Sequence, residues 1–184
     1  MAEPAAPYVA VIGPGACTEA EAAAAFAVGA GLGRAGAVVV CGGLGGVMAA
    51  ACRGARSVGA TTVGILPGAD RRAANPHVSV AIATGMGELR NGLVVRSADA
   101  LVAVGGAWGT LSEIALAVKA GRPVVGVGTW QLTPPGGAAG AGGDAAGAGG
   151  GGAAAGAPAD GGAGVIAAAD ADEAVRLVLA AIGR

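Results

Sequence analysis

Residues 104–113, VGGAWGTLSE, decide how the rest of this chain is interpreted. They follow an apolar run at residues 100–104 and lead into a helix-like segment at residues 111–119, the order of a strand, a loop and a helix. Three glycines in five positions let backbone N–H groups approach a ligand without an intervening Cβ, and a helix N-terminus adds partial positive charge. The stretch therefore predicts a loop that binds an anion. Its predicted contacts are Gly105, Gly106, Gly109 and Thr110.

A second glycine loop, GGLGGVM at residues 42–48, follows the apolar run at residues 37–41 and leads into a helix-like segment that ends near Val58. It differs from the dinucleotide fingerprint G-x-G-x-x-G, because Met48 stands at the third glycine position and no acidic residue ends the preceding strand to bind a ribose. NAD binding is therefore disfavoured. Tight packing between strand and helix is the alternative role for these glycines.

The rest of the chain alternates strand and helix patterns. The apolar run at residues 8–12 ends at Gly13, and Thr18 to Glu21 match a capping box that begins a helix over residues 19–34. Further strands are predicted at residues 61–66, 78–82, 124–127 and 164–167, with a last helix after Asp170. This order predicts an α/β fold with a doubly wound, mostly parallel sheet of the Rossmann-like type, whose ligands bind at the carboxyl ends of the strands.

Residues 134–162 interrupt this pattern with a sequence of nearly pure glycine and alanine. Such a segment cannot bury enough apolar surface to offset the entropy lost on ordering, which predicts a disordered surface insertion without chemistry. The expectation is one Rossmann-like domain over residues 1–184, with an ordered core at about 7–132 and 163–183.

Composition excludes several classes of partner. The net charge is −1, and Tyr8, Phe26, Trp108 and Trp130 are the only aromatic residues, so stacking rings interleaved with basic residues are missing and nucleic-acid binding is not expected. The first residues lack a basic n-region, and the uncharged runs are too weakly apolar to span a membrane. We expect a cytoplasmic protein with no membrane partner.

Cysteine spacing indicates neither a disulfide framework nor a zinc site. Cys17, Cys41 and Cys52 are odd in number, lack C-x-x-C spacing and come with a single histidine, His77. They are interpreted as small buried apolar residues in a reducing compartment. No metal site and no required cofactor are predicted.

The central loop from Gly105 to Glu113 resembles the G-G-x-G-T-x-x-E signature of the LOG-like Rossmann proteins, some of which were long taken for lysine decarboxylases. The loop at residues 42–48 is similar to that family's upstream glycine motif, and residues 88–91, ELRN, occupy the place of its arginine motif. The resemblance implies a homo-oligomer, a dimer or a tetramer.

Enzymes of that family cleave the N-glycosidic bond of cytokinin nucleoside 5′-monophosphates. The resemblance then implies that Glu113 and Arg90 form a catalytic pair, with the loop glycines and Thr110 on the phosphate. Glycosidic cleavage builds positive charge on the sugar, which a carboxylate can stabilise, and an arginine can hold phosphate oxygens bidentately.

Two differences direct the interpretation to another branch. Val104 stands where the active enzymes carry proline, and Arg90-Asn91 replaces their Arg-Lys. Arg-Asn resembles the molybdenum-cofactor carrier proteins, which bind a pterin phosphate without a known reaction. We therefore expect a binder of a phosphate-bearing nucleotide or of a pterin such as the molybdenum cofactor, with a phosphoribohydrolase as the alternative. Whether the chain is an enzyme stays open.

The predicted ligand contacts are Gly13, Gly42, Gly43, Gly46, Met48, Arg90, Asn91, Gly105, Gly106, Trp108, Gly109 and Thr110.

Structural alternatives exist for the key residues. Thr110 to Glu113 is itself a capping-box pattern, which would explain Glu113 without catalysis. Arg90 could be a surface or dimer-interface residue, and Trp108 either a stacking wall for a ring or an apolar plug over the loop. A lysine decarboxylase is excluded, because pyridoxal phosphate needs a Schiff-base lysine and the only lysine, Lys119, lies far from the anion site. Arg71 and Arg72 could contact a phosphate, but a solvated loop is the expected place for them. His77 is expected to be structural, and Asp99 a turn residue.

Overall fold

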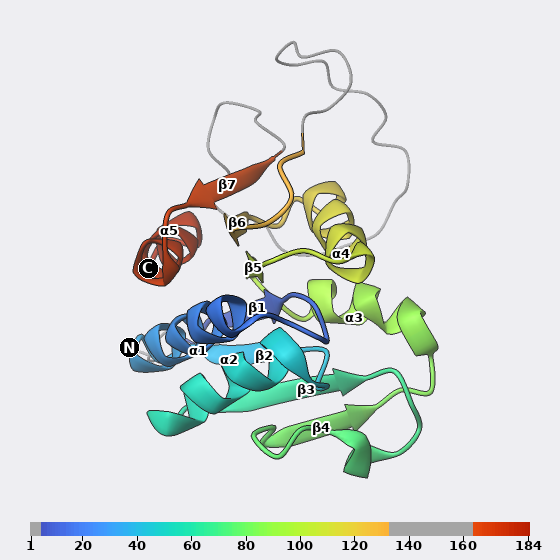
Figure 1. The fold of residues 1–184 in the computed structure, drawn as a ribbon. Coiled ribbons are helices and arrows are strands. Elements are labelled where there is room, and N and C mark those ends of the chain that lie inside the picture. Colours follow the sequence, from blue (N-terminus) through green and yellow to red (C-terminus); the bar gives the residue numbers. More distant parts are fainter. Residues whose placement is uncertain (1–4, 133–163) are drawn as a thin grey trace.

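The computed structural model describes residues 5–132 and 164–184, which form one seven-stranded parallel sheet in the order β4-β3-β2-β1-β5-β6-β7 (Figure 1). The strands are β1 (Tyr8–Ile12), β2 (Val38–Cys41), β3 (Thr62–Leu66), β4 (Val80–Ala83), β5 (Ala100–Val104), β6 (Val124–Val127) and β7 (Val165–Ala168). The helices are α1 (Glu19–Arg34), α2 (Gly46–Ser57), α3 (Asn91–Arg96), α4 (Trp108–Lys119) and α5 (Ala171–Ala181), with short 3₁₀ turns η1 (Arg71–Ala73) and η2 (Gly87–Arg90). The doubly wound parallel sheet is confirmed, whereas the insertion predicted at residues 134–162 lies outside the described residues.

Two apolar layers sandwich the sheet. Along β1, Val9 and Val11 pack with α1, α2 and α5, whereas Ala10 and Ile12 pack with α3 and α4. Side chains alternate across a strand, so a strand covered on both faces reads as a continuous apolar run. This double burial explains why the four buried residues of β1, Val9 to Ile12, are all apolar.

Glycines on α1 and α2 allow the two helices to pack in backbone contact. A Cβ on Gly29 would lie 2.0 Å from the carbonyl oxygen of Ala51, and one on Gly54 would lie 2.0 Å from that of Phe26. Any side chain at these positions would separate the helices. The glycines of this pair are therefore required by packing.

Helix starts follow the expected capping chemistry in α1 and differ in α4. The Thr18 hydroxyl accepts from the Glu21 N–H, and the Glu21 carboxylate accepts from the Thr18 N–H, which confirms that capping box. Helix α4, however, begins at Trp108 and not at Leu111. Its start is fixed by Thr110, whose hydroxyl oxygen accepts from the N–H of Ala107 at 3.3 Å. The loop is therefore shorter than predicted, and Thr110 already belongs to the first turn.

Strand β4 also begins later than predicted, at Val80 instead of residue 78. Before Val80, the hydroxyl of Thr62 donates to the carbonyl of His77 and accepts from the N–H of Ser79, which also donates to the Thr62 carbonyl. Within residues 5–132 and 164–184, no helix has the length and apolar character needed to cross a membrane.

Candidate functional site

The predicted site lies where the carboxyl ends of β1, β2 and β5 meet. The chain runs from β1 to β2 on one side and returns to β5 on the other side of β1, so the loops after these strands border a topological switch point. Gly13 lies at the centre of this edge. A Cβ there would lie 2.4 Å from the Val104 carbonyl oxygen and 2.6 Å from Cγ1 of Val47. The missing side chain therefore lets the end of β1 pack against the end of β5 and the start of α2.

A buried ion pair joins the two residues expected to carry the chemistry. Nη1 of Arg90 lies 3.6 Å from Oε1 of Glu113. Arg90 ends η2 and Glu113 lies in the second turn of α4, so two crossing segments bring them together. Their exposed fractions are 8% and 6%. The proximity is as expected, and the alternative of Arg90 as a surface residue is wrong.

The carboxylate of Glu113 is in an unfavourable environment for charge. Burial raises its pKa to about 7, although the Arg90 guanidinium lowers it in part. The capping-box explanation for Glu113 is wrong, because α4 begins at Trp108 and the third residue of the helix is Thr110. Glu113 thus carries a titratable group that the helix start does not need.

The Arg90 guanidinium faces the β2–α2 loop. A Cβ on Gly42 would lie 2.7 Å from both Nη atoms of Arg90 and 2.8 Å from Sδ of Met48, so only glycine leaves room for them. Among the described residues, the buried Nε of Arg90 has no hydrogen-bond partner. A buried guanidinium N–H without an acceptor is costly, and a ligand oxygen would satisfy it.

The remaining glycines of this loop serve its shape. Gly43 and Gly46 have φ of 76° and 60°, in the left-handed region that favours glycine. A Cβ on Gly46 would lie 2.3 Å from the carbonyl oxygen of Pro14, and one on Gly43 would lie 2.9 Å from Cδ2 of Leu66. The packing role considered for these glycines therefore applies to Gly43 and Gly46, while Gly42 borders the arginine.

The β5–α4 loop is more open. Gly105 has a φ of 64° and donates its N–H to the carbonyl of Val127, while the Glu21 carboxylate fills the space beside its Cα. A Cβ on Gly109 would meet no atom within 4 Å. The first N–H groups of any helix lack intrahelical acceptors, so the first turn of α4 offers donors beside open space. The hydroxyl of Thr110, by contrast, is buried and is already bonded to the Ala107 N–H.

Two tryptophans lie beside this loop. The ring centroids of Trp108 and Trp130 are 5.6 Å apart with an interplanar angle of 32°, and Trp108 is 79% exposed. This exposure leaves little of the Trp108 ring to pack as an apolar plug over the loop. A Cβ on Gly106 would lie 2.7 Å from Nε1 of Trp130, whose buried N–H has no partner among the described residues. Sequence reasoning missed Trp130, although its place just after β6 puts it at the carboxyl edge of the sheet.

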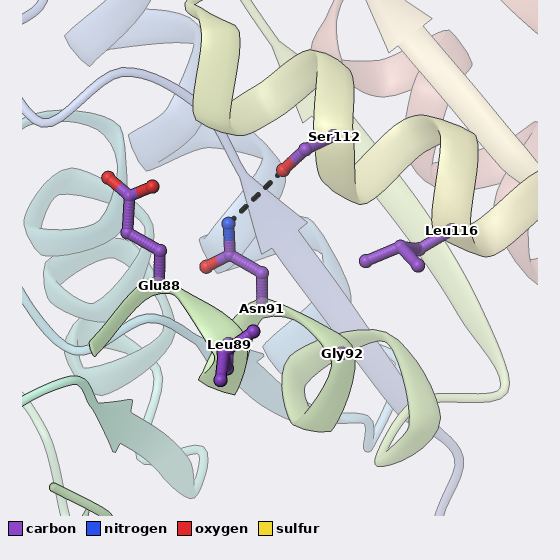
Figure 2. Close-up of a pocket in the computed structure, with 6 residues that line it drawn as sticks. All are labelled: Glu88, Leu89, Asn91, Gly92, Ser112 and Leu116. Atoms are coloured by element: carbon purple, nitrogen blue, oxygen red, sulfur yellow. Dashed lines mark hydrogen bonds between the residues drawn. The ribbon is translucent and has the colours of Figure 1, made fainter. Parts of the chain in front are cut away.

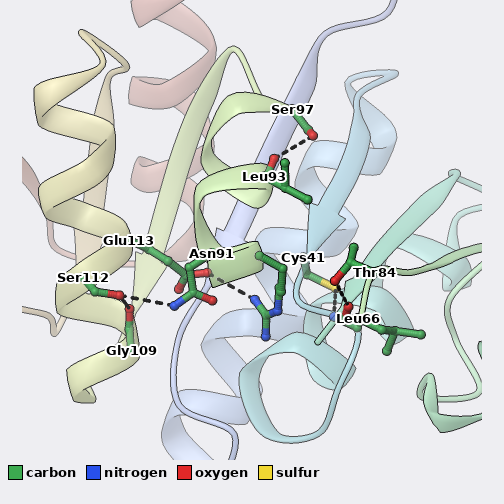
Figure 3. A network of polar contacts seen from close by, with 11 residues as sticks. Cys41, Leu66, Thr84, Asn91, Leu93, Ser97, Gly109, Ser112 and Glu113 are labelled. Carbon is green, nitrogen blue, oxygen red and sulfur yellow. Dashed lines mark hydrogen bonds and ion pairs between the residues drawn. The ribbon is translucent and has the colours of Figure 1, made fainter. Parts of the chain in front are cut away.

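The Asn91 side chain points toward α4 (Figure 3). Its Nδ2 donates to Oγ of Ser112 at 3.2 Å, and that hydroxyl donates to the carbonyl of Gly109 at 2.7 Å (Figure 3). The two residues border an open pocket of about 370 Å³ between α3 and α4 (Figure 2). The pocket is lined by Glu88, Leu89, Asn91, Gly92, Ser112 and Leu116. Ser112 was not expected, because its contact depends on how α3 crosses α4.

Other polar residues lie away from this centre. Arg72 pairs with Asp70 at 2.9 Å on an exposed turn, and the Asp99 carboxylate accepts from the N–H of Tyr8, which agrees with loop and turn roles. Lys119 ends α4, at the opposite end from the loop. In the described residues, no three His, Cys, Asp or Glu side chains gather as a metal site would require.

The model of the SLOG cluster4 family matches residues 6–138 of the chain. The chain belongs to the SLOG cluster4 family. An uncharacterised protein from Archaeoglobus fulgidus is 44% identical over 127 residues, which cover 69% of this chain and 80% of that protein. The glycine loops, Arg90 and Glu113 all fall in the matched range of the SLOG cluster4 chain.

Solved structures relate this SLOG cluster4 chain to molybdenum-cofactor proteins. The molybdenum cofactor carrier protein from Chlamydomonas reinhardtii is 30% identical, with a TM-score of 0.76 over 98% of this chain and 100% of that chain. The molybdenum cofactor binding protein from the phototrophic bacterium Rippkaea orientalis is 38% identical, with a TM-score of 0.65 over 66% of this chain and 76% of that chain. The resemblance to LOG-like Rossmann proteins, and to their carrier branch, is confirmed.

Proposed function

We propose that the chain binds a small phosphate-bearing ligand, a pterin of the molybdenum-cofactor type or a nucleotide, at the carboxyl edge of the sheet. One observation supports this most: the buried Arg90 has an unpartnered Nε, and its Nη atoms lie against Gly42 of the β2–α2 loop. A monodentate partner at 3.6 Å leaves the guanidinium with free donors, and phosphate oxygens suit their planar fork.

Both ends of such a ligand have a complement in this site. Arg90 and the first N–H groups of α4 would bind the phosphate, and the exposed ring of Trp108 would stack on the pterin or base. The open space at Gly109 lets a ligand approach the backbone. The ligand is cargo in this proposal, since the apolar layers of the sheet account for the fold without a cofactor.

The carrier-type solved structures favour a pterin ligand over a nucleotide. Two of them bear molybdenum-cofactor names at 30% and 38% identity. In this chain Asn91, the residue that distinguishes the carrier branch, bonds to Ser112 and so ties α3 to the N-terminal half of α4. We infer that Asn91 positions the loop and does not itself need to bind the ligand.

Isothermal titration calorimetry with AMP, GMP and molybdopterin tests the proposal. We expect measurable affinity for at least one ligand, with a loss of about tenfold or more in Arg90→Gln, because charge-assisted bonds of a buried arginine are lost. Arg72→Gln, on an exposed turn, is the matched control and should bind like the wild type. No heat of binding with any of the three ligands would contradict the proposal.

A nucleoside monophosphate phosphoribohydrolase is the second candidate, and the state of Glu113 favours it. A carboxyl group with a pKa of about 7 can exchange protons near neutral pH, as a general acid or base must, and this one lies 3.6 Å from Arg90. Chromatography should then detect free base released from AMP, and Glu113→Gln should abolish it. Binding of AMP without release of base would eliminate this candidate.

We also propose a cytoplasmic homo-oligomer, a dimer or a tetramer, without a nucleic-acid or membrane partner. Leu89 of η2, which is 79% exposed, and the exposed Leu116 of α4 line the same pocket, and exposed apolar side chains often mark contacts between subunits. Light scattering should give a mass of two or four chains, and Leu89→Asp should lower it. A monomeric wild type would contradict this assembly.

A further inference from the structure

Two buried thiols touch beside the candidate site. Cys41 ends β2 and Cys52 lies in the middle of α2, and their Sγ atoms are 3.4 Å apart with both residues fully buried. The helix folds back over the strand that precedes it, which brings together residues eleven positions apart. The expectation of isolated apolar cysteines therefore missed a dithiol. Cys17, the third cysteine, lies just before α1.

The surroundings distinguish the two sulfurs. The hydrogen bond with Cys52 and burial raise the pKa of Cys41, whereas the same hydrogen bond lowers the pKa of Cys52. These directions favour ionisation of Cys52 over that of Cys41. This is the arrangement of an attacking thiolate beside a resolving thiol.

Cys41 is also connected to the β2–α2 loop. Its Sγ accepts a hydrogen bond from the N–H of Gly43 at 3.3 Å, and the next residue, Gly42, borders the Arg90 guanidinium. Met48, whose Sδ lies against Gly42, belongs to the same buried cluster as the two cysteines. A movement of Cys41 Sγ would therefore disturb the β2–α2 loop directly.

We propose that Cys41 and Cys52 form a redox-active dithiol, which a peroxide closes to a disulfide, and that closure weakens ligand binding at the neighbouring loop. The expected effect of the disulfide on ligand binding rests on the proposed function. The Cys52 thiol loses its proton, its thiolate attacks one peroxide oxygen and the O–O bond breaks; the departing hydroxide takes up that proton, which gives a sulfenic acid and water. The Cys41 thiol then attacks that sulfur, expelling a second water. In sum, two thiols and one hydrogen peroxide give one disulfide and two waters.

Geometry explains why closure affects the loop. A disulfide bond is about 2.05 Å long, so the sulfurs must approach each other by more than 1 Å. Cys41 Sγ is also the acceptor of the Gly43 N–H, so its movement disturbs that hydrogen bond, and the loop beside the Arg90 guanidinium must adjust. Reduction restores the hydrogen bond and the loop.

The first experiment follows the covalent step. Full-length Cys17→Ser protein, which retains only the pair, is treated with hydrogen peroxide and examined by intact mass spectrometry. We expect a loss of about 2 Da and the disappearance of both free thiols, reversed by dithiothreitol. Single variants Cys41→Ser and Cys52→Ser in the same background should show no such loss. A gain of about 16 Da or more on the intact pair, or two persistent thiols, would overturn the dithiol.

The second experiment measures AMP affinity of the Cys17→Ser protein by calorimetry before oxidation, after it, and after dithiothreitol. We expect affinity about tenfold weaker in the oxidised form, with full recovery. Peroxide should leave the affinity of Cys52→Ser unchanged. An unchanged affinity in the disulfide form would overturn the coupling. If the reduced protein failed to bind any of the three ligands, the proposed function would fail, while the mass measurement would still decide the dithiol.

Discussion

Two glycine-rich regions of this molecule use the missing side chain in opposite ways. Between α1 and α2, the space beside Gly54 is filled by the backbone of the facing helix. At the carboxyl edge of the sheet, the space beside Gly42 holds the end of the Arg90 side chain, and the space beside Gly109 is open. The first region needs glycine for packing and the second for access. A glycine's role therefore depends on which atoms lie beside it.

The largest expected effect concerns the packed region. Gly54→Ala would put a Cβ 2.0 Å from the Phe26 carbonyl oxygen, which neither helix backbone can avoid without moving apart. We expect a loss of about 3 kcal/mol or more in the free energy of unfolding, measured by urea denaturation. Gly68→Ala, which meets no atom within 4 Å, is the control and should change stability by at most about 0.5 kcal/mol. Equal stability of the two variants would refute the packing role.

The next effect concerns the buried carboxyl group of Glu113 at the carboxyl edge of the sheet. Burial raises the pKa of Glu113 from its usual 4.5 to about 7, so between these values the native state holds a proton that the unfolded state releases. The free energy of unfolding should then fall as pH rises from 4.5 to 7, by at most about 3 kcal/mol. Glu113→Gln should lack this part of the slope in denaturation series across that range. Parallel wild-type and variant curves would show that Glu113 titrates normally.

The smallest effect separates the two positions of the open region. A Cβ at Gly42 meets the flexible ends of Arg90 and Met48, so Gly42→Ala should fold but displace the guanidinium, with AMP affinity reduced about tenfold. Gly109→Ala should leave stability within about 0.5 kcal/mol and reduce affinity only a few-fold, through closer approach of a Cβ to the ligand. Calorimetry on both variants measures the difference. If Gly109→Ala lost more affinity than Gly42→Ala, the helix start would matter more than the arginine.

Local patterns in the sequence were sufficient for the fold. The strands, the order of elements and the capping box at Thr18 depend on neighbouring residues, and the structure has them within about two residues, apart from the earlier start of α4. The start of α4 was misplaced because Thr110 to Glu113 repeats the same capping pattern. In the fold, Thr110 reaches back to Ala107, and Glu113 turns to Arg90.

The site was only partly predictable, because local sequence patterns reveal its loops but not the contacts between distant segments. Its glycine loops are local motifs, whereas the proximity of Arg90 to Glu113 was available only through the family resemblance. The contacts of Trp130 with Trp108 and of Cys41 with Cys52 depend on how separate segments pack, and no spacing in the sequence indicates them. Tertiary contacts of this kind require the structure.

A crystal structure of the protein with AMP would test the central claim most directly. We expect the phosphate within hydrogen-bond distance of the Arg90 guanidinium and of the first N–H groups of α4, with the base beside Trp108. A phosphate bound elsewhere, with Arg90 still contacting only Glu113, would contradict the account.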